Sequence, residues 1–174
     1  YQDQDTEAFA EYKKCENSYN AYVYEQYLQV PDSLKQMLTK VLASDSDEKD
    51  SENVTSHISY EEANTRITGY LNENITYTEE IDPKNTDVSG ENQKTDAKTG
   101  NFVTDFLMTE KKGYSVHYAS AAVLMYRCLG IPARYVEGYL VTPEMVENAQ
   151  DDGTIYVTGK EAHAWVEIYQ DGIG

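Results

Sequence analysis

The chain has 174 residues, of which 40% are hydrophobic and 26% charged, a composition typical of one soluble globular domain with its own core. Its 31 acidic and 14 basic side chains give a formal net charge of −17, which argues against binding to nucleic acid or to an anionic membrane surface, because both need clustered lysine and arginine. Solubility is the simple interpretation of this acidity, and a cationic partner or substrate is the alternative.

The N-terminal part of the chain predicts one amphipathic helix. Residues 1–27 are polar, acidic and rich in tyrosine. Their alternation of polar and apolar side chains is too weak to indicate a strand. We therefore interpret residues 1–32 as an N-terminal extension. From Pro31 onward, apolar residues recur at the spacing of one helix face. These residues are Leu34, Met37, Leu38, Val41 and Leu42.

The middle of the chain predicts a second helix between two polar segments. Residues 44–57 have no apolar pattern and indicate a loop. The second helix begins at Ser59 as the N-cap, and Glu62 three residues later completes the pattern of a capping box. A short extended segment follows over residues 75–78. Residues 82–101 have almost no apolar side chains, so we expect a functional or mobile insertion loop within a single domain, residues 1–174.

Residues 102–174 carry the most regular pattern and indicate the ordered core of that domain. Residues 102–107 predict a short helical turn, and residues 115–129 predict a strong helix that Gly130 ends as its C′ residue. Three strands are predicted after it, over residues 134–141, 154–157 and 163–169. Helices followed by antiparallel strands predict an α+β fold.

The cysteine and histidine residues limit the possible site chemistry. Cys15 and Cys128 could form one disulfide, but Cys128 lies in an apolar helical run and is expected to be a buried small side chain. No cysteine or histidine pair has metal-ligand spacing, so we expect neither a metal nor another cofactor. We expect His57 to be solvated and His117 to be partly buried and structural, with a role as base the less favoured alternative. His163 differs because it opens a strand rich in aromatic residues.

Ser115 has two interpretations when considered by itself. Serine is a preferred N-cap, and this is the simpler interpretation at the start of a helix. A side chain there also lies near unpaired backbone N–H groups and the positive end of the helix dipole. Such an environment lowers the pKa of a thiol and can stabilise an oxyanion, but it activates a serine hydroxyl far less.

Several separated motifs, in order, resemble the bacterial transglutaminase-like family. Residues 113–121 read Gly-Tyr-Ser-Val-His-Tyr-Ala-Ser-Ala, where the family has a glycine, an aromatic residue and a cysteine before a helix. Residues 126–139 contain the Gly-Ile-Pro-Ala-Arg turn and a Gly-Tyr strand, and residues 163–167 read His-Ala-Trp-Val-Glu. The resemblance implies a papain-like fold, with N-terminal helices packed on an antiparallel sheet and one or more C-terminal strands missing.

The resemblance also implies roles for particular residues. The family uses a Cys-His-Asp triad for acyl transfer or for amide or peptide hydrolysis. By position, Ser115 occupies the nucleophile slot and His163 the base slot. The aspartate would follow Gly174 on a further strand and is therefore not expected in this chain. Tyr114, Trp165 and Tyr77 are candidates for lining the substrate cleft, although core packing is the simpler interpretation of Trp165.

The serine leaves two functional hypotheses open. It is either an engineered change that silences an enzyme or a natural residue, which would indicate a non-catalytic relative or an attenuated nucleophile. The first hypothesis is therefore a thiol-enzyme scaffold that is inactive or attenuated as the Ser115 form. The alternative is a non-catalytic extracellular module that binds peptide or cell wall.

Partners and location follow from the resemblance. A protein or peptide is the expected substrate, with an amine or a cell-wall component as further candidates and no nucleic acid. No apolar run reaches the roughly 18 residues of a membrane span, and no signal peptide opens the chain. Since bacterial relatives often carry this domain outside the membrane, we expect an excised piece of a larger protein, tethered to a bacterial membrane on its extracellular face.

Overall fold

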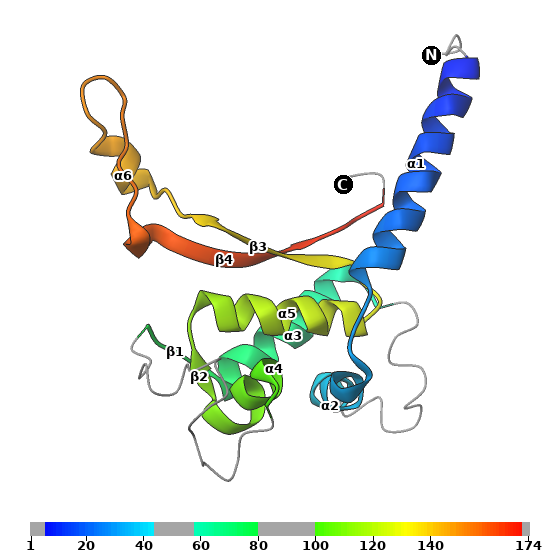
Figure 1. Ribbon diagram of the computed structural model, residues 1–174, viewed down its shortest axis with the longest axis horizontal. Helices are drawn as coiled ribbons and strands as arrows, with labels where there is room; N and C mark the ends of the chain where they lie inside the picture. Colours follow the sequence, from blue (N-terminus) through cyan, green and yellow to red (C-terminus); the bar gives the residue numbers. More distant parts are fainter. Residues whose placement is uncertain (1–5, 44–57, 80–99, 172–174) are drawn as a thin grey trace. The chain divides into compact units, whose positions relative to one another are not determined.

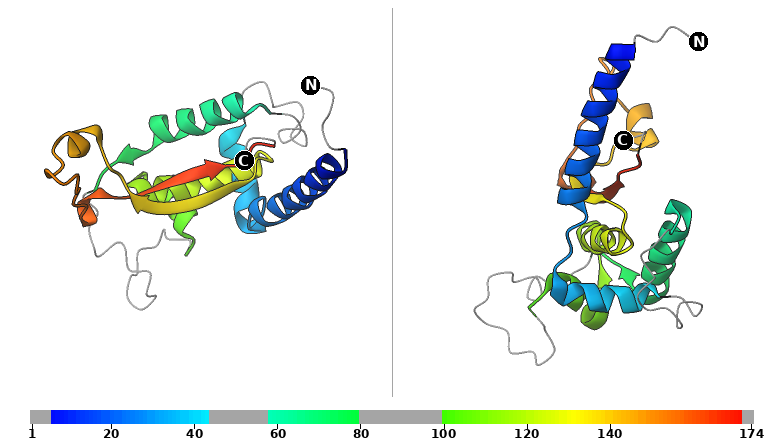
Figure 2. Two further views of the ribbon diagram at one scale, coloured as in Figure 1. Left: turned by 90° about the horizontal axis from the view of Figure 1, so that it is seen from above. Right: turned by 90° about the vertical axis from the view of Figure 1, so that its right-hand side faces the viewer.

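The computed structural model describes residues 6–43, 58–79 and 100–171 of the chain (Figures 1 and 2). The loop predicted over residues 44–57, His57 and most of the 82–101 insertion lie outside the described residues. Within them, no helix combines the length and apolar character that crossing a bilayer requires. The helices are α1 (Thr6–Tyr27), α2 (Asp32–Leu42), α3 (Tyr60–Asn74), α4 (Phe102–Thr104), the π-helical turn η2 (Asp105–Glu110), α5 (Ser115–Cys128), α6 (Pro143–Glu147) and the 3₁₀ turn η3 (Gly159–Glu161). The strands are β1 (Thr76–Tyr77), β2 (Lys112–Gly113), β3 (Ala133–Tyr139) and β4 (Ala162–Ile168).

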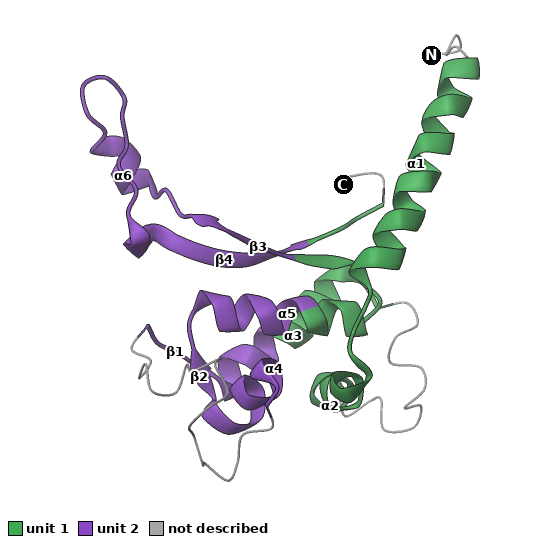
Figure 3. Ribbon diagram, viewed as in Figure 1, with its two compact units in different colours: residues 1–67, 124–134, 168–174 green, residues 68–123, 135–167 purple. Residues whose placement is uncertain are grey.

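The chain divides into two compact units (Figure 3). Unit 1 comprises residues 1–67, 124–134 and 168–174, and unit 2 comprises residues 68–123 and 135–167. Both units draw on α5, because its first nine residues belong to unit 2 and its last five to unit 1.

The core of unit 1 is built on the helix predicted after Pro31, and that prediction is confirmed by α2. Leu34, Leu38 and Leu42 are buried along one face of α2, at the i, i+4 and i+8 positions of a helical stripe. The N-cap predicted for α3 is also present, since the Ser59 hydroxyl accepts a hydrogen bond from the Glu62 N–H at 3.1 Å. Further buried residues of unit 1 are Val23, Ala63, Ile67, Met125, Tyr126, Cys128, Leu129, Ile131 and Ala133.

The C-terminal end of α5 is tied into unit 1 by a glycine turn and an arginine. Gly130 has a φ of 77°, a left-handed conformation that costs little only for glycine. The Ile131 N–H bonds to the Tyr126 carbonyl at 3.0 Å, as in a Schellman motif, which confirms the predicted helix stop. Arg127 donates to the carbonyls of Ala133 at 2.9 Å and Gln29 at 3.1 Å, and so links β3 to the segment between α1 and α2.

Residues 6–27 form a helix, which the sequence pattern did not reveal. No glycine or proline interrupts them, and alanine, glutamate, lysine and glutamine are good helix formers. Only Val23 of α1 is buried, so the periodic apolar stripe that would have indicated a helix is missing. Near its C-terminal end α1 uses its tyrosines for contacts within unit 1. Tyr19 meets the ring of Tyr169 edge-on at 5.8 Å, and Tyr24 donates to Asp171 at 3.3 Å.

In unit 2, helix α5 lies along one face of the antiparallel β3–β4 pair (Figures 1 and 2). Two backbone hydrogen bonds at opposite ends of the pair show the antiparallel direction. The Leu140 N–H donates to the Glu161 carbonyl at 2.8 Å, and the Tyr169 N–H donates to the Pro132 carbonyl at 2.9 Å. These strands confirm the predictions over 134–141 and 163–169. Buried residues of unit 2 are Leu71, Ile75, Val103, Phe106, Leu107, Ala119, Ala121, Ala122, Val123 and Ala164.

The strand predicted over residues 154–157 is absent. Asp151-Asp152-Gly153 form a tight turn instead, in which Gly153 has a φ of 80° and the Asp152 carboxylate accepts from the Thr154 N–H at 2.9 Å. The Thr154 carbonyl then accepts from the Gln150 N–H within the same turn. The backbone of Thr154 is therefore bonded within a turn and not in a strand ladder.

A second, parallel strand pair precedes α5 and brings glycine into close packing. Thr76 and Tyr77 of β1 pair with Lys112 and Gly113 of β2. A Cβ atom at Gly113 would lie 2.7 Å from the His117 ring and 2.9 Å from the Phe106 ring. The entry into α5 is therefore held at a separation that only glycine allows.

We predict that Gly113→Ala destabilises the protein by about 1–3 kcal/mol, because the added methyl group must displace buried rings. Gly69→Ala is the matched control. Gly69 lies in α3 of the same unit, and a Cβ there meets nothing within 4 Å. That substitution should leave stability unchanged or raise it by about 0.5–1 kcal/mol. Urea unfolding of both variants measures the difference, and equal stabilities would contradict the close packing.

Candidate active site

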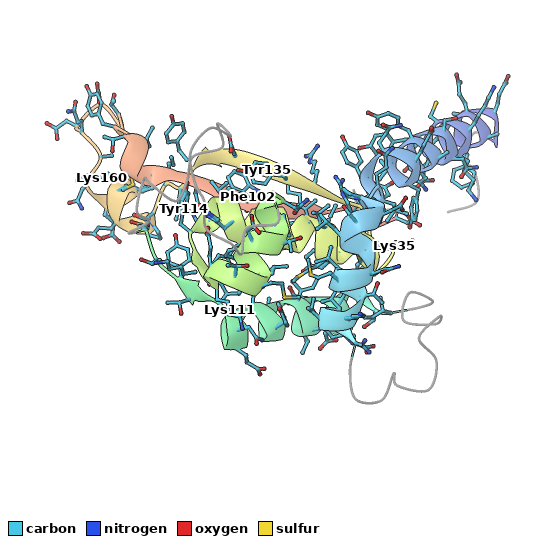
Figure 4. All side chains as sticks on the ribbon, turned by 60° about the horizontal axis from the view of Figure 1, so that its bottom comes forward. Lys35, Phe102, Lys111, Tyr114, Tyr135 and Lys160 are labelled. Carbon is cyan, nitrogen blue, oxygen red and sulfur yellow. The ribbon has the colours of Figure 1, made fainter. Side chains whose placement is uncertain are left out.

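A cavity of about 570 Å³ in unit 2 collects the residues to which the sequence assigned chemistry. Four segments line it: the end of β1, the start of α5, the end of β3, and η3 with the start of β4. The residues are Tyr77, Glu79, Tyr114, Ser115, Val116, Glu137, Gly138, Tyr139, Gly159, Lys160, Ala162 and His163. Tyr114 and Lys160, two of these residues, are labelled in Figure 4.

Ser115 is the first residue of α5 and is not its N-cap. The first intrahelical bond runs from the Tyr118 N–H to the Tyr114 carbonyl at 3.2 Å, which places Tyr114 at the N-cap position. The side chain of Ser115 is 7% exposed and lines the cavity. The N–H groups of Ser115 and Val116 precede the first intrahelical bonds, as the opening N–H groups of a helix do. The simple interpretation of Ser115 as a capping serine therefore does not fit the geometry.

His163, the second residue of β4, lines the same cavity. It is half-buried, and the next residue, Ala164, is buried, so packing of the strand fixes the backbone that carries the imidazole. Ser115 and His163 are thus brought to one cavity from positions 48 residues apart in sequence (163 − 115). The resemblance implied that these two residues share a site, and the shared cavity is consistent with it.

Two of the three cleft candidates line the cavity, and the third does not. Tyr77 and Tyr114 are lining residues. Trp165 is 38% exposed, so it is not a core residue either. Its ring covers Gly138, where a Cβ would lie 2.8 Å from the indole, and its Nε1 donates to Glu167 at 3.2 Å. Trp165 therefore packs against a lining residue of β3 without lining the cavity itself.

The sequence did not single out the charged lining. Glu79 and Glu137 bring two carboxylates to the cavity, and Lys160 brings one ammonium group. Tyr135 donates a hydrogen bond to the Glu137 carboxylate, and burial together with this bond raises the pKa of Tyr135 to about 12. Glu137 lies inside the Val-Glu-Gly-Tyr part of a family motif, a signal that could have found it. Lys160 lies in no motif.

His117 supports the start of α5 and takes no place in the cavity lining. Its ring is buried, stacks on Phe102 at 4.8 Å and meets Tyr114 edge-on at 4.6 Å (Figure 4 labels both neighbours). Its Nδ1 accepts from the Tyr114 N–H at 3.4 Å. Burial lowers the pKa of His117, although the nearby Glu110 acts in the opposite direction. The prediction of a buried structural histidine is therefore confirmed.

The two cysteines are free thiols: Cys15 is exposed and Cys128 buried. Burial raises the pKa of Cys128 to about 11, so it is not a nucleophile at neutral pH. Across residues 6–43, 58–79 and 100–171, no three histidine, cysteine, aspartate or glutamate side chains converge as a metal site would require.

Comparison with known proteins decides the family. A model of the transglutaminase-like superfamily matches residues 49–174. The chain belongs to this superfamily. This match confirms the family resemblance seen in the sequence. The likeness to solved structures confirms the α+β fold.

Two curated relatives are similar in sequence. The uncharacterized protein YebA of Bacillus subtilis is 32% identical over 160 residues, which cover 90% of this chain and 19% of that protein. The protein-glutamine gamma-glutamyltransferase of Pseudomonas aeruginosa is 40% identical over 68 residues, which cover 39% of this chain and 10% of that protein. The chain thus spans a fifth or less of the relatives that it matches.

Solved structures show the same fold. The periplasmic domain of TgpA from Pseudomonas aeruginosa, bound to ethylmercury, superposes with a TM-score of 0.58 and 23% identity over 88% of this chain and 46% of that chain. A second structure of the same periplasmic domain gives a TM-score of 0.53 and 22% identity over 88% of this chain and 45% of that one.

The buried imidazole of His117 predicts a pH dependence of stability. Its pKa in the folded state lies below the unfolded value of about 6.5. Between those two values the unfolded chain binds a proton that the folded chain does not, so stability is complete above about pH 6.5 and falls as the pH drops below it. Urea unfolding from pH 7.5 to 5.5 should show this loss, and His117→Gln should reduce it. An equal loss in that variant would exclude His117 as the cause.

Proposed function

We propose that the cavity is a transglutaminase-like site for acyl transfer or amide hydrolysis, in which position 115 is the nucleophile position and His163 the base. The observation that carries this proposal is that the first residue of α5 and the first histidine of β4 line one cavity. A nucleophile at a helix start facing an imidazole on a strand is the arrangement that thiol enzymes use.

The local physics favours a thiol at position 115. The opening N–H groups of α5 and the positive end of its dipole stabilise a thiolate, and an imidazolium at His163 would do so further. The same N–H groups are placed to hold the oxyanion that forms when a carbonyl is attacked. A serine hydroxyl has too high a pKa to be ionised by this environment. We therefore expect the chain with Ser115 to have no acyl-transfer or hydrolytic activity, or a strongly reduced one.

With cysteine at position 115, the reaction would proceed through a thioester. The thiolate sulfur attacks a carboxamide carbon, the carbon–nitrogen bond breaks, and the imidazolium of His163 gives its proton to the departing amine or ammonia. Water or a primary amine then attacks the thioester, with His163 taking its proton and the sulfur leaving as thiolate. We assign the role of the aspartate that would orient His163 to no residue of this chain.

Substrate and location follow from the relatives. One similar protein carries the name protein-glutamine gamma-glutamyltransferase, which supports a protein carboxamide as the substrate. Two solved structures with this fold are described as a periplasmic domain, which supports a position outside the cytoplasmic membrane, as part of a membrane-tethered protein. An amine or a cell-wall component remains the candidate acceptor.

The serine itself favours a second candidate function. If Ser115 is the natural residue, the cavity would serve as a binding site in a non-catalytic extracellular module that holds peptide or cell-wall polymer. In this second function the same cavity would bind its ligand without cleaving a bond.

Alkylation of Ser115→Cys in the full-length protein separates the two functions. At pH 6 the new thiol should react with iodoacetamide at least about tenfold faster than Cys15, because a lowered thiol pKa increases the thiolate fraction. Mass spectrometry of the labelled peptides measures each site separately. Cys15 is exposed and serves as the internal reference, whereas the buried Cys128 should stay unlabelled.

Two further variants serve as controls. His163→Ala in the Ser115→Cys background should remove most of the rate advantage, since the imidazolium no longer stabilises the thiolate. Tyr156→Ala in the same background should retain it, because Tyr156 is 71% exposed and does not line the cavity. If residue 115 reacts no faster than Cys15, the catalytic proposal is wrong and the binding module is favoured.

A further inference from the structure

The segment between β3 and β4 is ordered without a core of its own. We call residues 140–158 the arm; it includes α6 and belongs entirely to unit 2 (Figure 3). None of its residues is buried. Backbone hydrogen bonds close the arm at both ends. The Gln150 N–H donates to the Thr154 carbonyl at 3.0 Å near the tip, and the Leu140 N–H donates to the Glu161 carbonyl at 2.8 Å at the base.

Side-chain caps hold the turns of the arm in place. The Thr142 hydroxyl accepts from the Met145 N–H at 3.3 Å and begins α6. At the other end, Thr158 and Glu161 form a capping box in which the Thr158 N–H donates to the Glu161 carboxylate at 2.6 Å. The conformation is therefore set by local hydrogen bonds, and the apolar side chains of the arm take no part in a buried core.

Those apolar side chains are exposed to solvent. The exposed fractions are 54% for Leu140, 45% for Val141, 56% for Val146, 71% for Tyr156 and 41% for Val157. Single exposed apolar residues are ordinary, but five of them on one short, well-capped segment favour a surface that another molecule covers.

The charge of the arm indicates what that molecule carries. The arm has four acidic residues, Glu144, Glu147, Asp151 and Asp152, and no lysine or arginine. Nucleic acid, anionic lipid and anionic polymers are repelled by such a surface. A polypeptide segment with basic and apolar side chains is complementary to it in both respects.

The arm is also continuous with the candidate active site. Tyr139 immediately before it and Gly159 and Lys160 immediately after it line the cavity. A polypeptide lying on the arm would thus be led to the cavity that holds Ser115 and His163. Two carboxylates of that cavity, Glu79 and Glu137, extend the acidic character inward.

We propose that the arm is a docking surface for a basic, apolar-containing segment of the protein substrate. The assignment of that segment to a substrate rests on the proposed function, whereas binding to the arm does not. The Ser115 form is well suited to the test, because little or no turnover is expected while the peptide is bound.

Fluorescence anisotropy tests the binding with three short labelled peptides. One alternates lysine and leucine, the second has glutamate for lysine, and the third has serine for leucine. The first should bind, more weakly as salt is raised, and both others should bind much less, because the surface requires charge and apolar contact together.

Variants then locate the binding surface. The triple variant Leu140→Ser, Val146→Ser, Tyr156→Ser should weaken binding of the first peptide by about tenfold or more, since apolar anchors at an interface carry most of its affinity. Glu144→Gln with Glu147→Gln should reduce its salt dependence. The matched control is Phe9→Ser, Tyr12→Ser, Met108→Ser, which removes three exposed apolar side chains elsewhere and should change binding by less than about twofold.

Two results would overturn the proposal. One is binding that survives the arm substitutions or that is lost equally in the control variant. The other is a dimer, seen by sedimentation, that dissociates in the arm variant, because the surface would then belong to a second copy of the chain. Alkylation of Ser115→Cys, repeated in the arm variant, keeps this test separate from that of the proposed function. A fast rate together with lost peptide binding supports both proposals. A rate no faster than that of Cys15 contradicts the proposed function alone, and peptide binding that survives in the arm variant contradicts the docking surface alone.

Discussion

The candidate site depends on the close packing of the His117 and Phe106 rings against the backbone of Gly113. That residue ends β2, pairs with Tyr77 of β1, and leaves no space for a Cβ against His117 and Phe106. Because His117 in turn accepts the Tyr114 N–H, one packed cluster determines where α5 begins. The position of Ser115, and the direction in which the first N–H groups of the helix point, both follow from that cluster. The buried imidazole of His117 is thus a structural support for the proposed nucleophile position.

The sequence predicted the elements that bury a periodic apolar face or end in distinctive turn residues. Helix α2 shows its stripe at Leu34, Leu38 and Leu42, α5 ends at a glycine with positive φ, and β4 opens with the histidine motif. These features were visible because local propensity and tertiary packing agree in them. The family motifs then brought Ser115 and His163 together, which no periodicity argument could have done across 48 residues (163 − 115).

The remaining features depend on partners that are distant in sequence. Helix α1 buries only Val23, so it has no stripe to detect, and its tyrosines find their contacts near the far end of the chain. Residues 154–157 alternate like a strand, but the backbone N–H and carbonyl of Thr154 are bonded within the turn that surrounds Asp151-Asp152-Gly153. The charged lining of the cavity likewise comes from three separate segments, with Glu79 after β1, Glu137 in β3 and Lys160 in η3.

The exposed indole of Trp165 gives the molecule a built-in optical probe. It is the only tryptophan of the chain, it lies two residues from His163, and its ring rests on Gly138, which lines the cavity. Its emission therefore comes from a single known place on the β3–β4 pair. Any molecule that enters the cavity and shifts Gly138 or its neighbours changes the surroundings of that ring, so occupancy can be followed by intrinsic fluorescence without a label.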